Sequence, residues 1–142
     1  MLPEKIQLDI VTPERGLVSE AVDELILPGT EGYLGVRPGH APLLTALTVG
    51  AIEYRKGKDV RYLSLSWGFA EVLPDRVAIL AEIAEKAEEI DVDRAGRARE
   101  RAEQRLRKPD SDTDFRRAQV ALQKALARLQ VAAKAQTATR QS

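Results

Sequence analysis

The hydrophobic period of the sequence changes near Asp91, and this change constrains the fold more than any other feature. Before it, apolar and polar residues alternate in short runs such as IQLDIVT, VRYLSLS, FAEVLP and RVAILAE, which Gly and Pro residues separate. A period of two is typical of half-buried strands. We therefore expect an N-terminal antiparallel β-sandwich of about ten strands over residues 1–84, with tight turns at KGKD (56–59) and LPDR (73–76).

After Asp91 the apolar residues recur every three or four positions, as on one face of a helix. The first set is Ala95, Ala98, Ala102 and Leu106, and the second is Phe115, Ala118, Leu122, Ala125, Leu129 and Ala132. The intervening KPDSDTD breaks the helix and supplies caps for the next one. The sequence thus predicts a linker (85–90), a C-terminal antiparallel two-helix hairpin (91–134) and a disordered tail (135–142). The fold class is mixed, β then α.

The predicted hairpin has a thin apolar seam. Alanine side chains bury little area, and at about 25 cal/mol per Å² they stabilise by only a few kcal/mol, which ordering costs offset. We therefore expect the hairpin to need the sandwich, a partner or a ligand to hold it closed. A marginal element of this kind is a natural candidate for a switch.

Charge divides the chain in the same way as the hydrophobic period. Residues 1–90 carry nine Lys/Arg and fifteen Asp/Glu (−6), whereas residues 91–142 carry thirteen and seven (+6). This asymmetry predicts two units that have different tasks or that attract each other. Nucleic-acid binding by the +6 half is disfavoured, because no aromatic side chain interleaves with its arginines.

Several classes of function are excluded or disfavoured by what the sequence lacks. There is no Cys, and one His makes a metal site improbable. No apolar run is as long as a membrane span, and MLPEKIQLDI is no signal peptide, so we expect a soluble chain without direct membrane insertion. The phosphate-binding Gly-rich loop, GxSxG and HExxH motifs are all missing, which predicts no catalytic residues.

Basic side chains form two helical stripes. One stripe is Arg94, Arg97, Arg101 and Arg105, and the other is Arg117, Lys124 and Arg128. Arg94 and Arg101 are about 10 Å apart along a helix, and guanidinium groups and helix N-termini both bind phosphate. A structural interpretation stays open beside this one, with Asp91 as an N-cap and Glu100 and Glu103 paired with arginines on a solvated face.

A Gly- and Pro-rich loop, PGTEGYLGVRPGHAPLLTAL (28–47), precedes the central strands. It contains His40, for which we favour hydrogen bonds to loop carbonyls over catalysis, since no orienting partner is evident. A loop with so little conformational freedom is also a good docking surface.

The order of these parts resembles the epsilon subunit of the bacterial rotary (F-type) ATP synthase. The loop EGYLGVRPGHAPLLTAL, the strand pair YLSLSWGFAEVLPDRVAILAE and EEIDVDRA carry the resemblance, which runs from about residue 6 to residue 133. It implies a non-catalytic central-stalk subunit, peripheral on the cytoplasmic face of the bacterial cell membrane. Its sandwich would bind the gamma subunit and the c-subunit ring. Its mobile hairpin would inhibit ATP hydrolysis by meeting the beta and alpha subunits of the catalytic head.

The resemblance also implies particular residues. Some family members bind ATP at Ile/Leu–Asp–x–x–Arg–Ala, which stands here as Ile90, Asp91, Arg94 and Ala95, with support from Glu85, Arg101, Lys124 and Arg128. No cofactor is required, and ATP would be a regulatory ligand. Lys124 replaces an arginine of nucleotide-binding members and lacks its bidentate fork.

Further positions are implied for the partners of such a subunit. The c-ring docking loop would contain Glu31, Gly32, Tyr33 and His40, and Arg97, Arg105 and Arg117 would contact the catalytic head. Tyr33 stands where other members can have an acidic residue. An alternative function, a stand-alone nucleotide-sensing regulatory domain, is motivated by the arginines after Asp91.

Overall fold

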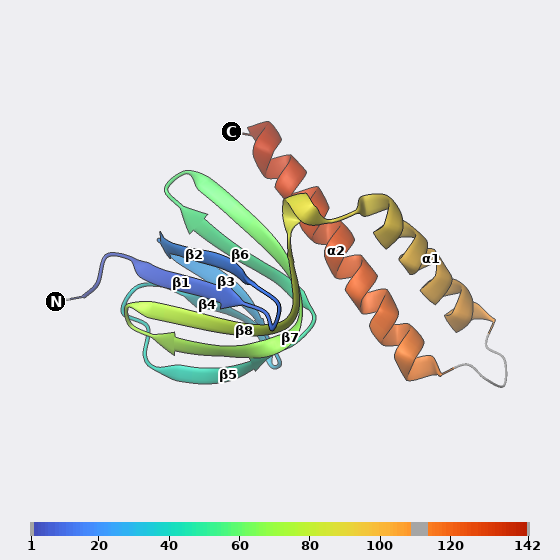
Figure 1. The fold of residues 1–142 in the computed structure, drawn as a ribbon, viewed down its shortest axis with the longest axis horizontal. Coiled ribbons are helices and arrows are strands. Elements are labelled where there is room, and N and C mark those ends of the chain that lie inside the picture. The colour runs from blue at the N-terminus through green and yellow to red at the C-terminus, as the bar shows by residue number, and fades with distance from the viewer. Residues whose placement is uncertain (1, 109–113, 142) are drawn as a thin grey trace.

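A computed structural model of the chain describes residues 2–108 and 114–141. It shows a β-sandwich followed by two helices, as the change of hydrophobic period predicts (Figure 1). The strands are β1 (Ile6–Val11), β2 (Gly16–Val22), β3 (Glu24–Gly29), β4 (Gly32–Val36), β5 (Leu43–Leu47), β6 (Gly50–Lys56), β7 (Asp59–Leu73) and β8 (Arg76–Lys86). After them come a 3₁₀ turn η1 (Ala87–Glu89), α1 (Val92–Arg107) and α2 (Phe115–Gln141).

The structure has eight strands where the sequence predicted about ten. The runs VRYLSLS and FAEVLP, predicted as separate strands, are one 15-residue strand, β7. Alternation is interrupted at Trp67, where the backbone turns to a φ of 62° without ending the strand. Both predicted turns are present, at residues 57–58 and 74–75.

Strand β7 connects the two layers of the sandwich. The sheet order is β2-β1-β8-β7-β5-β3-β4, and β6 pairs with both β3 and β7. Along one edge of β7, β6 pairs with its first half and β5 with its second half. The pairing is antiparallel as expected, with the exception of β1 and β8, which run parallel.

Alternation along the strands buries one side of each layer. The largest side chains with almost no exposed surface include Ile6, Leu8, Ile10, Leu25, Leu27, Leu47, Ile52, Leu63, Leu65 and Ile79. All of them precede residue 85, so the sandwich has its own apolar core, independent of the helices.

The two helices meet through the predicted alanine seam. Ala95, Ala102, Ala118 and Ala125 are buried, and Leu122 and Leu129 are half-buried. Two residues predicted for the seam lie elsewhere: Phe115, the first residue of α2, is 50 % exposed, and Ala132 packs in a second apolar cluster with the sandwich.

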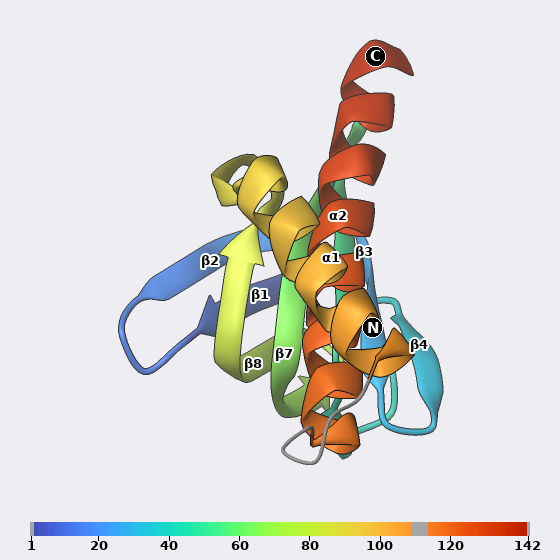
Figure 2. The same cartoon turned by 90° about the vertical axis from the view of Figure 1, so that its right-hand side faces the viewer.

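Helix α2 lies between the sandwich and α1, and Figure 2 shows α1 in front of it from the helical side. Its sandwich-facing side forms a second apolar cluster, in which Val131 and Ala132 pack with Ala51, Ala87 and Ile90. Small residues on β6 and η1, Ala51 and Ala87, lie on the sandwich side of this cluster, and Tyr62 on β7 packs against it. The hairpin therefore obtains from the sandwich the support that its thin seam cannot supply.

Two predicted boundaries differ from the structure. The tail after residue 134 was predicted to be disordered, but α2 continues to Gln141, since its alanines favour helix and Ala135 packs against the second cluster. The predicted linker is shorter than expected, because β8 continues to Lys86. Ser142 and residues 109–113 lie outside the described part of the chain.

Candidate functional site

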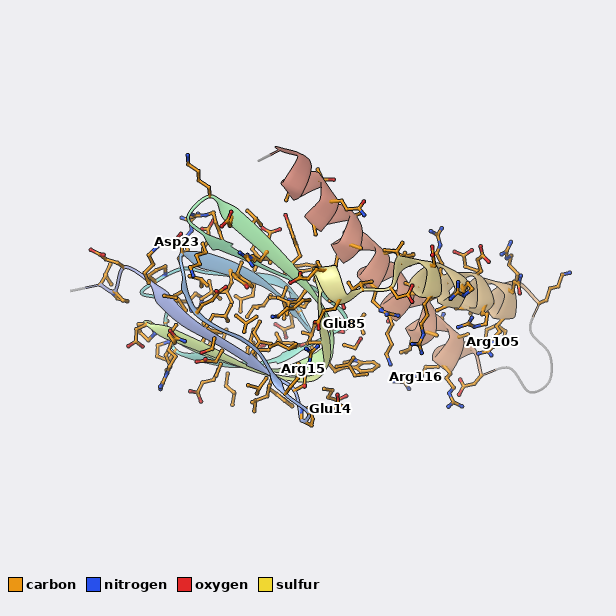
Figure 3. All side chains as sticks on the ribbon, turned by 45° about the horizontal axis from the view of Figure 1, so that its top comes forward. Glu14, Arg15, Asp23, Glu85, Arg105 and Arg116 are labelled. Carbon is orange, nitrogen blue, oxygen red and sulfur yellow. The ribbon has the colours of Figure 1, made fainter. Side chains whose placement is uncertain are left out.

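Arg128 on α2 is joined to Glu85 at the end of β8. Its Nε lies 2.7 Å from Oε1 and its Nη2 lies 3.3 Å from Oε2, a fork geometry. The side chains are 24 % and 27 % exposed, so water screens the pair only in part. Figure 3 shows Glu85 at the end of the sandwich that faces the helices. The pair ties the middle of α2 to the sheet.

Lys124 makes a second contact between α2 and the sandwich, one helical turn before Arg128. Its Nζ lies 4.7 Å from the centroid of the Trp67 ring, within range of a cation–π interaction. The sequence analysis did not identify Trp67 as a site residue. Its only signal was a large aromatic side chain directly before Gly68 within a strand.

Three residues of the predicted nucleotide motif have structural roles. Ile90 is buried in the second cluster, and Ala95 is buried in the seam. Asp91 is the N-cap of α1, and its Oδ1 accepts a hydrogen bond from the Arg94 backbone N–H at 3.0 Å. The capping interpretation of Asp91 is confirmed.

The guanidinium groups of Arg94 and Arg101 point into solvent. Both residues are exposed, and within residues 2–108 and 114–141 neither guanidinium makes a hydrogen bond or ion pair. Of the eight predicted nucleotide-site residues, the structure thus joins Glu85 to Arg128 and Asp91 to the Arg94 backbone. No contact links Arg94 or Arg101 to Lys124 or Arg128 among the interactions of the described residues.

The side chains predicted to meet a catalytic head, Arg97, Arg105 and Arg117, are exposed. Figure 3 shows Arg105 far out on α1, away from the sandwich. Nearby, Arg99 donates to Glu103 at 2.7 Å, and this hydrogen bond lowers the pKa of the Glu103 carboxyl. Of the two predicted pairings, Glu103 is thus paired with an arginine, whereas within the described residues Glu100, Arg97 and Arg105 make no ion pair.

The predicted c-ring loop is not a single loop: Glu31 lies in the turn between β3 and β4, Gly32 and Tyr33 begin β4, and His40 lies between β4 and β5. Glu31 and Gly32 are exposed, and Gly32 has a φ of 128°, which favours glycine. Tyr33 is 62 % exposed, but its hydroxyl oxygen accepts a hydrogen bond from the Ala51 backbone N–H at 3.1 Å. This bond fixes the turn against the start of β6.

His40 makes the loop contact that its structural interpretation predicts. Its Nδ1 lies 2.7 Å from the carbonyl oxygen of Ala41, and since a carbonyl only accepts, the ring nitrogen donates. The His40 backbone N–H also donates to the Arg37 carbonyl at 3.1 Å.

Arg15 holds the linker between sandwich and hairpin. Its Nη2 lies 2.8 Å and 3.0 Å from the two oxygens of Glu89 in η1. The pKa of Glu89 is lowered, first by a hydrogen bond from the Lys86 backbone N–H and then by Arg15. No local pattern predicted this contact, because 74 residues separate the partners.

Four exposed apolar side chains gather on adjoining strands. Leu80 on β8 stands between its ladder partners Val11 on β1 and Phe69 on β7, and Leu44 lies on the next strand, β5. They are 37–72 % exposed, and we name these four residues the outer apolar face. Their outward position in alternating strands is a signal that the sequence analysis missed.

Family models of known proteins match both parts of the chain. The β-sandwich domain of the ATP synthase delta/epsilon chain matches residues 5–87, and its long α-helix domain matches residues 88–133. The chain belongs to the delta/epsilon family of ATP synthase subunits. The resemblance that the sequence predicted is confirmed.

Full-length relatives within the delta/epsilon family agree. The ATP synthase epsilon chain of Syntrophobacter fumaroxidans is 54 % identical over 133 residues, covering 94 % of this chain and 99 % of that protein. The one from Geobacter sulfurreducens is 46 % identical over 135 residues, covering 94 % and 98 %.

Solved structures of the family share the fold. A chain in the cryo-EM structure of Euglena gracilis mitochondrial ATP synthase, OSCP/F1/c-ring, has a TM-score of 0.79 at 26 % identity, covering 89 % of this chain and 81 % of that one. A chain in the central stalk/c-ring structure from Tetrahymena thermophila has a TM-score of 0.58 at 16 % identity, which shows the fold alone.

Two further observations concern the described residues of this family member. No helix among them is long and apolar enough to cross a membrane. They also contain no group of three or more His, Asp or Glu side chains placed to hold a metal ion.

Proposed function

We propose that this chain is a non-catalytic rotor subunit in the central stalk of a proton-translocating ATP synthase, with its sandwich bound to the gamma subunit. The observation that carries the proposal is the outer apolar face. Exposed apolar residues are ordinary when scattered, but four on adjoining strands mark an interaction surface. Family membership identifies the kind of assembly in which such a surface is covered.

The same proposal assigns the turn at Glu31–Tyr33 to the c-subunit ring. The turn is exposed, and the hydroxyl of Tyr33 anchors it to β6, so it presents a fixed shape to a partner. Such a subunit is peripheral, on the cytoplasmic face of a bacterial membrane. It reaches the membrane through its partners.

We also propose that the hairpin regulates ATP hydrolysis by leaving the sandwich and meeting the catalytic head. Support comes from the few contacts that hold α2, namely Arg128 with Glu85, Lys124 with Trp67, and the second cluster. The exposed Arg97, Arg105 and Arg117 offer a cationic surface to an acidic partner.

ATP is the regulatory ligand that we propose for the compact form. Arg94 lies in the first turn of α1 and Arg101 about two turns later, and within the described residues neither guanidinium makes a hydrogen bond or ion pair, so both suit a polyphosphate. Lys124 and Arg128 on α2 are the other two cations that we propose for this set.

The docking proposal is tested by measuring the affinity of the chain for the gamma subunit. Leu80→Glu should weaken binding by at least about tenfold, since it places a charge in an apolar interface. The matched control is Ile26→Glu, an exposed apolar strand residue on β3, outside the outer apolar face. Binding of Leu80→Glu at wild-type affinity, with circular dichroism unchanged, would contradict the proposal.

Regulation is tested in the assembled complex with the chain ended after residue 90. Assembly should be unchanged and ATP hydrolysis should rise. Equal hydrolysis by both complexes would remove the regulatory role while leaving the rotor role intact.

Nucleotide binding is tested by calorimetric titration of the full chain with ATP. Arg94→Ala should abolish the heat of binding, and Arg107→Ala, in the last turn of the same helix, should not. Absence of heat with the unaltered chain would remove ATP from the proposal without affecting gamma binding.

A further inference from the structure

Trp67 has a backbone conformation that side chains rarely adopt. Its φ is 62°, and it is the only non-glycine residue with positive φ in the described part of the chain. For a bulky residue this left-handed conformation is strained, whereas glycine adopts it readily. Such strain persists where the surroundings compensate for it, and it concentrates at functional positions. The ring of Trp67 should therefore have a role that glycine could not fill.

The core of the sandwich does not supply that role. Trp67 is half-buried and is absent from the apolar cluster that fills the interior. The close packing at this point comes from its neighbour, Gly68, where an added Cβ would lie 2.4 Å from the carbonyl oxygen of Leu80. The kink at Trp67 coincides with the place where β7 changes partner from β6 to β5.

The contact that the ring does make is with α2. Lys124 Nζ lies 4.7 Å from the ring centroid, and Lys124 is itself half-buried. Four residues later, on the same side of the helix, Arg128 binds Glu85. Lys124 and Arg128 thus each have a partner on a different strand of the sandwich.

We propose that Trp67 is a latch that holds α2 on the sandwich through Lys124 in the absence of any ligand. Partial burial strengthens a cation–π contact, and the kink in β7 turns the ring toward the helix. An anionic ligand or acidic partner that recruits Lys124 must first separate it from this ring. The contact between Lys124 and Trp67 is observed in the structure. Its consequence for regulation rests on the proposed function.

Hydrogen exchange of the full chain tests the latch, with Trp67→Gly, Lys124→Met and the double variant. Glycine relieves the backbone strain, so the sandwich should stay folded, and methionine keeps the length of the lysine side chain without its charge. Each single variant should raise amide exchange in residues 120–138 by about threefold, the scale of a cation–π contact. The double variant should show no further increase, because both changes remove one contact.

Matched controls separate the latch from general effects. Phe69→Ala removes an exposed aromatic ring from the same strand, and Lys134→Met removes an exposed lysine from the same helix. Neither should alter exchange in α2. Since Trp67 is the single tryptophan, its fluorescence should also change in Lys124→Met and not in Lys134→Met.

Unchanged exchange in α2 for both single variants, or fully additive effects in the double variant, would overturn the proposal. If Trp67→Gly also raises hydrogen exchange in β8, glycine has loosened the sandwich itself. The double-variant comparison is then repeated with Trp67→Ala in place of Trp67→Gly, and the same two outcomes overturn the proposal. Gamma binding separates the two proposals. Normal gamma binding by Trp67→Gly and Lys124→Met, with hydrogen exchange in α2 unchanged, overturns the latch alone. Gamma binding by Leu80→Glu at wild-type affinity overturns the rotor assignment alone.

Discussion

Tyr54 and Glu20 show how one polar pair joins strands that share no backbone ladder. Tyr54 on β6 is buried, and the carboxylate of Glu20 on β2 lies 3.5 Å from Lys56 Nζ. Burial raises the pKa of Tyr54, and a hydrogen bond with Tyr54 is the main cause of the lowered pKa of Glu20. Since β2 is at one end of the sheet order, the pair helps to close the sandwich.

Tyr54→Phe should lower the free energy of unfolding by about 1.5 kcal/mol at pH 7, the scale of a hydrogen bond to a charged group. The lowered pKa of Glu20 means that its charged form is stabilised by folding. This stabilisation is complete above the unfolded pKa of about 4.3 and is lost as the pH falls below that value. The difference in the free energy of unfolding between the unaltered protein and Tyr54→Phe, measured in urea from pH 7 to pH 3, should therefore shrink toward zero in acid. A difference that stays constant with pH would contradict the assignment.

Gly68→Ala tests the close approach of β7 to β8. An added methyl group would lie 2.4 Å from the Leu80 carbonyl oxygen and 3.0 Å from Ala81 Cα, and neither backbone atom can move without disturbing the ladder. We expect a loss of about 2 kcal/mol or more in thermal or urea unfolding. Gly35→Ala on β4, where nothing lies within 4 Å, is the control and should change stability by less than about 0.5 kcal/mol.

At the scale of elements, α2 has two packed sides, and the sequence predicted only one. The spacing of Ala118, Ala125 and Leu129 indicated the seam with α1, which the structure confirms. The side formed by Val131, Ala132 and Ala135 faces the sandwich, and its alanines gave no distinguishing signal, because alanine suits either a seam or an exposed helix surface. Contacts such as Lys124 with Trp67 depend on this second side, so they were beyond sequence reasoning as well.

Val131→Ala tests the second side of α2. The Val131 side chain has no exposed surface, and it packs with Ala51 and Ile90. Its truncation should weaken docking of α2 by about 2 kcal/mol and raise hydrogen exchange in α2, with exchange in β1 and β8 unchanged. Leu126→Ala, 42 % exposed on the same helix, should have little effect. Equal exchange in α2 for both variants would show that the cluster does not hold the helix.

At the scale of the whole molecule, the sandwich and the hairpin differ in autonomy. The large apolar core lies entirely within residues 6–84, whereas the hairpin relies on the second cluster for support. The sequence predicted this asymmetry, because period-two runs and most aromatic residues precede Asp91. It could not predict the parallel pairing of β1 with β8 or the clamp of Arg15 on Glu89, since both join residues that are distant along the chain.

A chain ended after residue 90 should retain cooperative unfolding and the circular dichroism of a β-sandwich, because it keeps every residue of the large core. The separate fragment 91–142 should be weakly helical, since its alanine seam is thin and isolated helices are marginal in water. Thermal scans of the two pieces measure this difference. A stable, cooperatively melting fragment 91–142 would contradict it.

The parallel ladder between β1 and β8 has a consequence for the order in which the chain folds during synthesis. Gln7 on β1 is the ladder partner of Arg76 on β8. The sheet is therefore complete only after β8, the last strand, has been synthesised. The surface that receives α2, which includes Ala51 and Ala87, is also made before the helices are. Because domains form as their residues leave the ribosome, the hairpin arrives at a finished surface. Docking of the hairpin on the sandwich is thus the last step of folding during synthesis.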